Sequence, residues 1–132
     1  MRSHLMLIPD AYRRLEKEKG RSLRDTGAAG VAFTRKDLLE ALECLKGSRV
    51  AVLGGDVLEI NSGAQPDSFW YGKPKPTYDS WHADRRPGED LIDYIERSIA
   101  EAERYIRSYP DPEDGTILYS PVISELGVGS TA

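Results

Sequence analysis

The spacing of apolar residues predicts two amphipathic helices. One covers residues 35–46, with Thr34 as its N-cap and Gly47 as the residue that ends it. Its apolar residues, which share one helical face, are Leu38, Leu39, Leu42 and Leu45. The second and clearer helix ends before Pro110. Its apolar residues recur at spacings of three and four: Leu91, Ile95, Ile99, Ala102 and Ile106.

Shorter patterns predict one more helix and the strands. Residues 9–20 have a proline near the start and a glycine at the end, which favours a short surface helix. The apolar run 49–54 suits a central strand, and segments 57–60 and 69–71 are expected to pair as a hairpin across a turn-rich loop. Prolines before residues 77–81 place that strand at or near a sheet edge, and Pro121 either confines the strand at residues 116–123 to an edge or splits it.

These elements predict an α+β fold. We expect a small, mostly antiparallel sheet of about four strands packed against two to three helices, which form a single layer on one face. The 132 residues, 39% hydrophobic and 30% charged, suit a single domain over residues 1–132, with mobile ends at 1–8 and 127–132.

Composition and short motifs limit the cellular location and the kinds of chemistry that we expect of this protein. No apolar run approaches the roughly 20 residues of a membrane span, and the start of the chain lacks the features of a signal peptide, so we expect no membrane association and a cytoplasmic location. Cys44 is the single cysteine, and we expect a buried thiol. No Gly-x-Ser-x-Gly motif or histidine relay points to catalysis, and no cofactor is expected.

Charge is unevenly distributed along the chain. Residues 1–49 hold 11 basic and 7 acidic side chains, whereas residues 84–114 hold 5 basic and 10 acidic ones. A pI of about 5.2 argues against nucleic-acid binding. An acidic surface would instead attract a partner protein with a basic surface.

Gly54-Gly55-Asp56 is the most distinctive short motif. Two glycines directly after the predicted central strand would let the chain turn sharply and present Asp56 at the strand end. Asp56 either holds the turn through backbone hydrogen bonds or faces a partner, and the sequence leaves both open. The motif lacks the lysine and the following helix of a phosphate-binding loop.

Strand alternation over residues 77–82 places Asp79 and Trp81 on one face and Tyr78 and His82 on the other. Trp81 is either a core residue or a contact residue. The aromatic run at residues 69–71 must send Trp70 opposite to its neighbours, so at least one ring is expected to be exposed, as in protein interfaces. The candidate partner-binding residues are therefore Asp56, Asp79, Trp81, Asp84, Trp70 and Tyr71.

Five short segments carry a resemblance to a known family. They are residues 30–33 before Thr34, residues 41–45, Val52-Leu53-Gly54-Gly55-Asp56-Val57, Tyr78-Asp79-Ser80-Trp81 and Tyr94-Ile95-Glu96-Arg97-Ser98. In this order and spacing the chain resembles the immunity protein 40 family of bacterial polymorphic toxin systems. The resemblance covers roughly residues 9–106. It does not extend to residues 61–76 or beyond Tyr109, so the contact hypothesis for residues 69–71 has no support from it.

The resemblance implies an antitoxin that binds and neutralises a cognate toxin and has no reaction of its own. Asp56, Asp79 and Asp84 would then occupy a basic cleft of that toxin. Two alternatives stay open. One is a small metal-dependent hydrolase that uses the same three aspartates with His82. The other is a homodimeric structural module built on the edge strand at residues 116–123.

Overall fold

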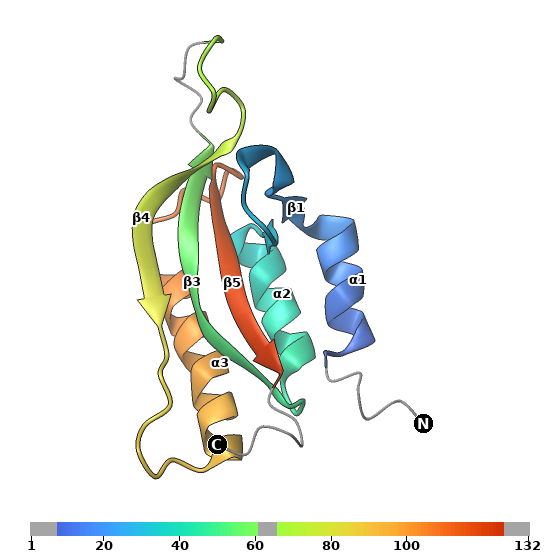
Figure 1. Ribbon diagram of the computed structural model, residues 1–132, viewed down its shortest axis with the longest axis vertical. Coiled ribbons are helices and arrows are strands. Elements are labelled where there is room, and N and C mark those ends of the chain that lie inside the picture. The colour runs from blue at the N-terminus through green and yellow to red at the C-terminus, as the bar shows by residue number, and fades with distance from the viewer. Residues whose placement is uncertain (1–7, 61–65, 126–132) are drawn as a thin grey trace.

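The computed structural model describes residues 8–60 and 66–125 (Figure 1). The elements in chain order are α1 (Asp10–Lys19), β1 (Arg21–Ser22), the short 3-10 helix η2 (Arg24–Thr26), β2 (Val31–Ala32), α2 (Arg35–Leu45), β3 (Val50–Ile60), β4 (Pro74–His82), α3 (Leu91–Ser108) and β5 (Ile117–Glu125). The ends that we expected to be mobile lie, except for Ile8, outside the described residues.

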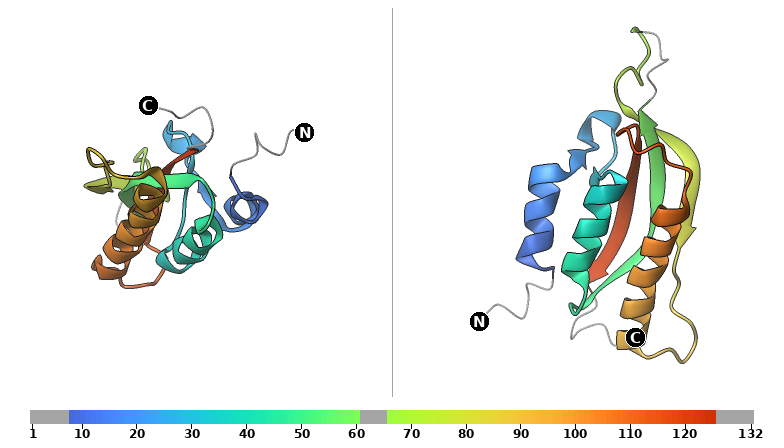
Figure 2. Two further views of the ribbon diagram at one scale, coloured as in Figure 1. Left: turned by 90° about the horizontal axis from the view of Figure 1, so that it is seen from below. Right: turned by 180° about the vertical axis from the view of Figure 1, so that it is seen from behind.

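The main sheet has three antiparallel strands in the order β4-β3-β5, and β1 and β2 form a separate two-stranded sheet. α2 and α3 lie side by side on one face of the main sheet, and α1 lies beside α2 on the side away from α3 (Figure 2). The expected α+β fold, with an antiparallel sheet and helices on one face, is confirmed. Three strands plus a small ribbon take the place of a four-stranded sheet.

The helices begin where the sequence predicts. Thr34 Oγ1 accepts a hydrogen bond from the Asp37 amide at 3.3 Å, and the Asp90 carboxylate accepts one from the Ile92 amide at 3.0 Å. The residues buried on α2 are Leu38, Ala41, Leu42 and Leu45, and those on α3 are Tyr94, Ile95, Ser98, Ile99, Ala102 and Ile106. Each large aliphatic side chain buried here contributes roughly 1.5–3 kcal/mol. Within the described part of the chain, no helix combines the length and apolarity needed to cross a lipid bilayer.

β3 is one continuous strand, so the turn predicted at Gly54-Gly55-Asp56 is wrong. The glycines serve close packing instead. A β-carbon at Gly54 would lie 2.3 Å from the Trp81 carbonyl oxygen, and one at Gly55 would lie 2.3 Å from Cη2 of the Trp81 ring. The pairing of β3 with β5 also shifts between Val52 and Gly54, which marks a bulge. The central position of β3 is confirmed.

The predicted hairpin between residues 57–60 and 69–71 is also wrong, because β3 pairs with β4 and residues 69–71 lie in their connection. The connection uses its amides in local turns: Tyr71 donates to the Ser68 carbonyl at 3.1 Å and Lys73 to the Trp70 carbonyl at 3.0 Å. β4 begins earlier than expected, at Pro74. Its edge position is confirmed and explains how it accommodates its prolines, since an edge strand can leave backbone donors unpaired.

β5 is the other edge strand, as expected, and it is partly covered. Phe33 and Tyr119 exchange two backbone hydrogen bonds, at 2.9 and 2.8 Å, which attach the segment after β2 to β5. The main core lies between the sheet and the helices. Ser98 is a buried polar residue in that core, and its hydroxyl accepts from the Val52 amide and donates to the Ile95 carbonyl.

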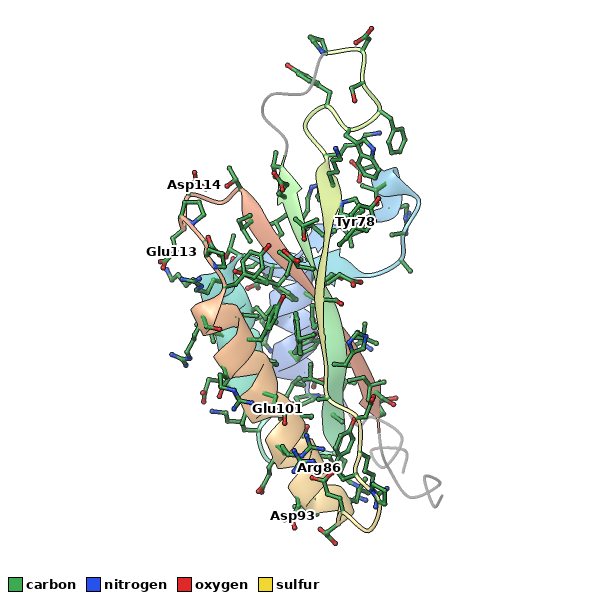
Figure 3. The ribbon with its side chains drawn as sticks, turned by 90° about the vertical axis from the view of Figure 1, so that its left-hand side faces the viewer. Tyr78, Arg86, Asp93, Glu101, Glu113 and Asp114 are labelled. Carbon is green, nitrogen blue, oxygen red and sulfur yellow. The ribbon has the colours of Figure 1, made fainter. Side chains whose placement is uncertain are left out.

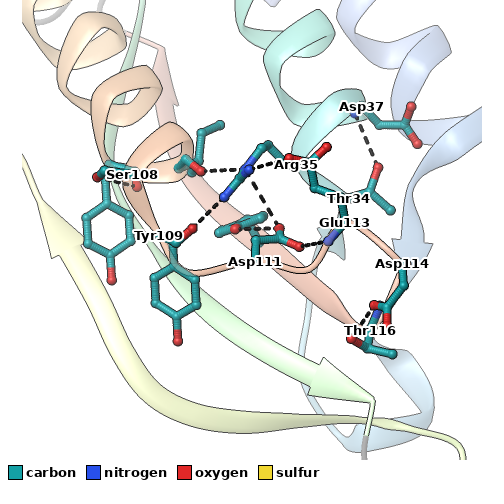
Figure 4. Close-up of polar contacts among 12 residues, drawn as sticks. Thr34, Arg35, Asp37, Ser108, Tyr109, Asp111, Glu113, Asp114 and Thr116 are labelled. Atoms are coloured by element: carbon teal, nitrogen blue, oxygen red, sulfur yellow. Dashed lines mark hydrogen bonds and ion pairs between the residues drawn. The ribbon is translucent and has the colours of Figure 1, made fainter.

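Arg35 joins the start of α2 to the end of α3 (Figure 4). Its Nε donates to the carbonyl of Ile106 at 2.8 Å, and a terminal nitrogen donates to the carbonyl of Tyr109. These carbonyls lie at the C-terminal end of α3, where the backbone lacks helical partners and the helix dipole favours a positive charge. One guanidinium therefore stabilises the end of α3 from another helix.

The same guanidinium faces a buried carboxylate. Arg35 Nε lies 3.8 Å from Asp111 Oδ2, and the Asp111 side chain is only 2% exposed. The Tyr119 hydroxyl donates to the same oxygen at 2.7 Å. Burial, and then the hydrogen bond to Asp111, raises the pKa of the Tyr119 hydroxyl. This cluster connects α2, the segment after α3 and β5.

Candidate functional site

Three large aromatic side chains are exposed around one end of the main sheet. Tyr78 on β4 is 89% exposed, and Phe69 and Tyr71 in the β3–β4 connection are each more than half exposed. The described part of this connection, residues 66–73, projects beyond the end of the sheet where β4 begins, as Figure 1 shows. Tyr78 lies on β4 toward that end (Figure 3). Aromatic side chains of this size contribute most when they are covered, so their exposure together indicates an interaction surface.

A bulge in β4 turns Tyr78 outward. Three residues of β4, Thr77, Tyr78 and Asp79, stand opposite a single residue of β3, Val57. Tyr78 has a φ of 71°, a left-handed conformation that is uncommon outside glycine. Thr77 Oγ1 donates to the Val57 carbonyl at 2.8 Å and accepts from the Asp79 amide at 3.1 Å, which holds the bulge. Backbone strain of this kind is concentrated at functional sites.

The surface beside Tyr78 is concave. A hollow of about 330 Å³ opens there, between the β1–β2 segment, the main sheet and the β3–β4 connection. The described residues that line it are Leu23, Thr26, Ala28, Ala29, Asp56, Val57, Leu58, Trp70, Pro74, Pro76, Tyr78, Asp79 and Ser120. We call this feature the aromatic hollow.

The floor of the aromatic hollow belongs to a small second core. Leu58 pairs directly with Leu118 across β3 and β5, and both pack with Leu23 and Ala32 of the β1–β2 segment. Because side chains alternate along a strand, Leu58 lies on the opposite face of β3 from Val57, which belongs to the main core. The floor of the aromatic hollow therefore lies on the face of the sheet away from α2 and α3, on packed side chains.

Two aspartates line the aromatic hollow. Asp56 and Asp79 are both exposed, and β3 and β4 bring them to the same concave surface. Asp79 accepts a hydrogen bond from the Tyr109 hydroxyl at 2.6 Å, which ties the β4 bulge to the end of α3. Burial, and then this bond, raises the pKa of the Tyr109 hydroxyl.

The structure brings together part of the predicted site. Asp56, Asp79 and Trp70 all line the aromatic hollow, and the exposed Tyr71 follows Trp70 directly. Asp84 is exposed but lies beyond the other end of β4, where its carbonyl accepts a hydrogen bond from Arg97 at 2.7 Å. Asp84 therefore does not join the other acids at the hollow.

Of the two roles that the sequence leaves open for Trp81, the structure shows the core residue. Its side chain is 6% exposed and stacks on Tyr105 of α3, with ring centroids 5.0 Å apart. The ring lies over Gly55, whose missing side chain makes room for it. Its indole nitrogen is buried without a hydrogen-bond partner. Packing against α3 and β3 accounts for the position of this tryptophan.

Sequence reasoning missed several contributors to this surface. It placed Tyr78 on a strand face without selecting it, because alternation cannot show a bulge and no residue near Tyr78 signals one. Leu23, Ala28 and Ala29 come from the segment between the helices predicted at residues 9–20 and 35–46, where the sequence pattern predicts no helix or strand. Their role depends on how that segment folds over the main sheet, which no local pattern reveals.

The described residues offer no cluster suited to a metal ion. Within residues 8–60 and 66–125, no group of three or more His, Cys, Asp or Glu side chains is arranged to hold one. His82 is exposed at the end of β4 and pairs in register with Gly54. The aspartates proposed as metal ligands are therefore not gathered around it.

Comparison with known protein families gives a match to this chain. The model of immunity protein 40 matches residues 22–123, a range that contains every described residue of the aromatic hollow. The match begins after α1 and extends past Tyr109, so it includes the loop and the β5 segment that the resemblance left out. No curated protein and no solved structure matches the chain at a significant level. The match covers most of the sequence, and this chain belongs to the immunity protein 40 family.

Proposed function

We propose that this protein is an antitoxin that binds a cognate bacterial toxin and neutralises it by covering part of its surface, without a reaction of its own. Membership of an immunity protein family supports a toxin as the partner. The protein would act in the cytoplasm of the cell that it protects, and the toxin would present a basic surface to it.

The observation that carries this proposal is the exposed aromatic surface around the aromatic hollow. Tyr78 is almost fully exposed although the backbone beneath it is strained, and two further aromatics are exposed nearby. The floor of the hollow is packed into the second core. A concave surface with rigid support loses little conformational entropy when it binds, which favours tight association.

The contacts that we propose follow from this geometry. Asp56, Asp79, Trp70 and Tyr71 stay proposed as partner-binding residues, and Tyr78 joins them. Asp84, beyond the other end of β4, stays proposed as an outlying contact. Trp81 would support this surface only from beneath, through β3 and β4.

The test is to capture the partner and measure its effect on growth. A tagged form of the chain would be produced in its native host and purified with whatever binds it. The captured protein should stop growth when produced alone, and co-production of the chain should restore growth. Tyr78→Ala and Trp70→Ala should weaken the complex, because large aromatics at an interface centre often contribute 2 kcal/mol or more, roughly 30-fold in affinity.

Ile92→Ala is the matched control. Ile92 is an exposed apolar residue at the start of α3, on the helical side of the sheet. This variant should bind the toxin as the parent does. Recovery of a toxin that binds Tyr78→Ala, Trp70→Ala and the parent equally would contradict the proposed surface, provided that circular dichroism shows all of them folded.

The two alternatives receive no specific support from the described residues. Asp56 and Asp79 share the aromatic hollow, but Asp84 lies apart, and the described chain holds no group of metal-ligand side chains. For a homodimer built on β5, part of the strand edge is already taken, since Tyr119 hydrogen-bonds to Phe33. An antitoxin is therefore the function that we put forward.

A further inference from the structure

The charge of the aromatic hollow has one sign. Among its described lining residues the only charged side chains are Asp56 and Asp79, and both are acidic. The nearby Lys73 is engaged elsewhere, with its ammonium nitrogen 4.0 Å from the centre of the Phe69 ring. A group that enters the hollow therefore meets two acidic residues and no lining cation from the described chain, which favours a positively charged occupant.

The two carboxylates differ in how they are engaged. Asp79 already accepts a short hydrogen bond from the Tyr109 hydroxyl, at 2.6 Å. The Asp56 carboxylate makes no hydrogen bond or ion pair with the described part of the chain, where only the backbone of Asp56 is paired. Asp56 is thus the carboxylate whose oxygens are available to a ligand, and its neighbours in register across the sheet, Ser80 and Ser120, add no opposing charge.

The remaining walls suit a cation with an apolar stem and a flat head. Trp70 and Tyr78 contribute aromatic rings, and Pro74, Pro76 and the floor residue Leu58 contribute apolar surface. A guanidinium stacks on aromatic faces and binds a carboxylate through two parallel hydrogen bonds, whereas an ammonium is a compact and more strongly hydrated charge. The chemistry of the walls therefore selects arginine over lysine.

We infer that the aromatic hollow receives one arginine side chain from the partner protein, with its guanidinium bound to Asp56 and flanked by Trp70 and Tyr78. The hollow, at about 330 Å³, admits such a side chain together with its stem. The identity of the partner as a toxin rests on the proposed function. The recognition of arginine rests on the hollow alone.

The test uses a small probe, so that it does not depend on the toxin. The probe is the capped tripeptide acetyl-Gly-Arg-Gly-amide, titrated into the full ¹⁵N-labelled chain and followed by amide and indole chemical shifts. We expect saturable shifts at Asp56, Tyr78 and the Trp70 indole, with a dissociation constant on the order of 10 mM for a ligand this small. The same peptide with citrulline in place of arginine, which is nearly isosteric but neutral, should bind at least several-fold more weakly.

Two variants separate the pairing at Asp56 from general attraction to an acidic protein. Asp56→Asn should weaken binding of the arginine peptide by about three- to tenfold, the range for a partly desolvated ion pair. Glu96→Gln, which removes an exposed acid on α3, should leave the binding unchanged. Asp56→Asn keeps the shape of its side chain at an exposed position, and the amide spectrum of each variant will show whether it is folded.

Several results would overturn the inference. Equal binding of the arginine and citrulline peptides would remove the role of charge, and equal binding of a lysine peptide would remove the role of the planar group. Shifts confined to α3 would place the attraction elsewhere. A chain that captures a growth-arresting toxin but does not respond to the arginine peptide disproves this inference and keeps the proposed function. A chain that binds the arginine peptide but captures no toxin disproves the proposed function and keeps this inference.

Discussion

Removal of the Arg35 side chain is expected to destabilise the fold strongly, although Arg35 does not line the aromatic hollow. In Arg35→Ala, the carbonyls of Ile106 and Tyr109 lose a charged donor at the end of α3. Asp111, whose side chain is 2% exposed, loses the positive charge 3.8 Å away. It keeps only the hydrogen bonds from the Tyr119 hydroxyl and the Glu113 amide.

The size of the effect follows from these losses. Leaving one member of a buried ion pair without its partner costs about 3–5 kcal/mol, and each hydrogen bond from a charged donor contributes about 1.5–3 kcal/mol. The Arg35 side chain is 16% exposed, so water can replace part of what is removed. We expect a net loss of about 3–4 kcal/mol. This is a large part of the roughly 7–20 kcal/mol that holds a domain of this size together.

Urea unfolding of the purified protein measures this loss. The midpoint should fall without a change in slope, and the melting temperature should drop by roughly 10–15 °C. Lys36→Ala is the matched control, because Lys36 is the next residue of α2 and is exposed. Arg35→Lys should recover only a minor part of the loss, since an ammonium cannot reproduce the guanidinium's divergent hydrogen bonds. A loss below about 1 kcal/mol in Arg35→Ala, or one equal to that of Lys36→Ala, would refute the reasoning.

Two further predictions concern packing and pH. Gly55→Ala should lower the free energy of unfolding by about 1–3 kcal/mol, because the added carbon would lie 2.3 Å from the Trp81 ring. In a double-mutant cycle, the same change made in the Trp81→Leu background should cost much less. An equal cost in both backgrounds would contradict the packing account. Hydrogen bonds from Arg97, followed by one from the Arg86 amide, lower the pKa of Glu89 from 4.5 to about 2. A carboxyl group with a lowered folded-state pKa contributes stability that is present above the unfolded-state pKa and is lost as pH falls, here between pH 4.5 and about 2. Unfolding monitored across that range should show a shallower pH dependence in Glu89→Gln, and an identical dependence would show that this ion pair does not contribute.

The helices could be predicted from the sequence because their signals are local. The cap at Thr34 and the four-residue spacing of Leu38 and Leu42 depend only on neighbouring residues, and both were found where expected. The strands were harder to predict from the sequence. Gly54-Gly55 has the composition of a turn, and only the ring of Trp81, which packs across the sheet, explains why a continuous strand needs glycine there.

The candidate site could be predicted only in part, because it too depends on contacts between segments that are distant in the sequence. Asp56 was selected at a predicted strand end, Asp79 on a face of a predicted strand and Trp70 in an aromatic run. The structure gathers all three at one hollow. Tyr78 did not stand out, because its exposure depends on two extra residues in the pairing of β4 with β3. The contribution of Leu23 depends on the β1–β2 segment folding over a sheet formed much later in the chain.

The central claim is that the aromatic surface around the hollow is where the toxin binds. Hydrogen–deuterium exchange, measured by mass spectrometry on the chain alone and on its complex with the captured toxin, tests this claim most directly. We predict that protection gained in the complex will concentrate in peptides covering residues 22–30 and 66–80. Protection that appears along α3 instead, with none gained in those two segments, would contradict the account.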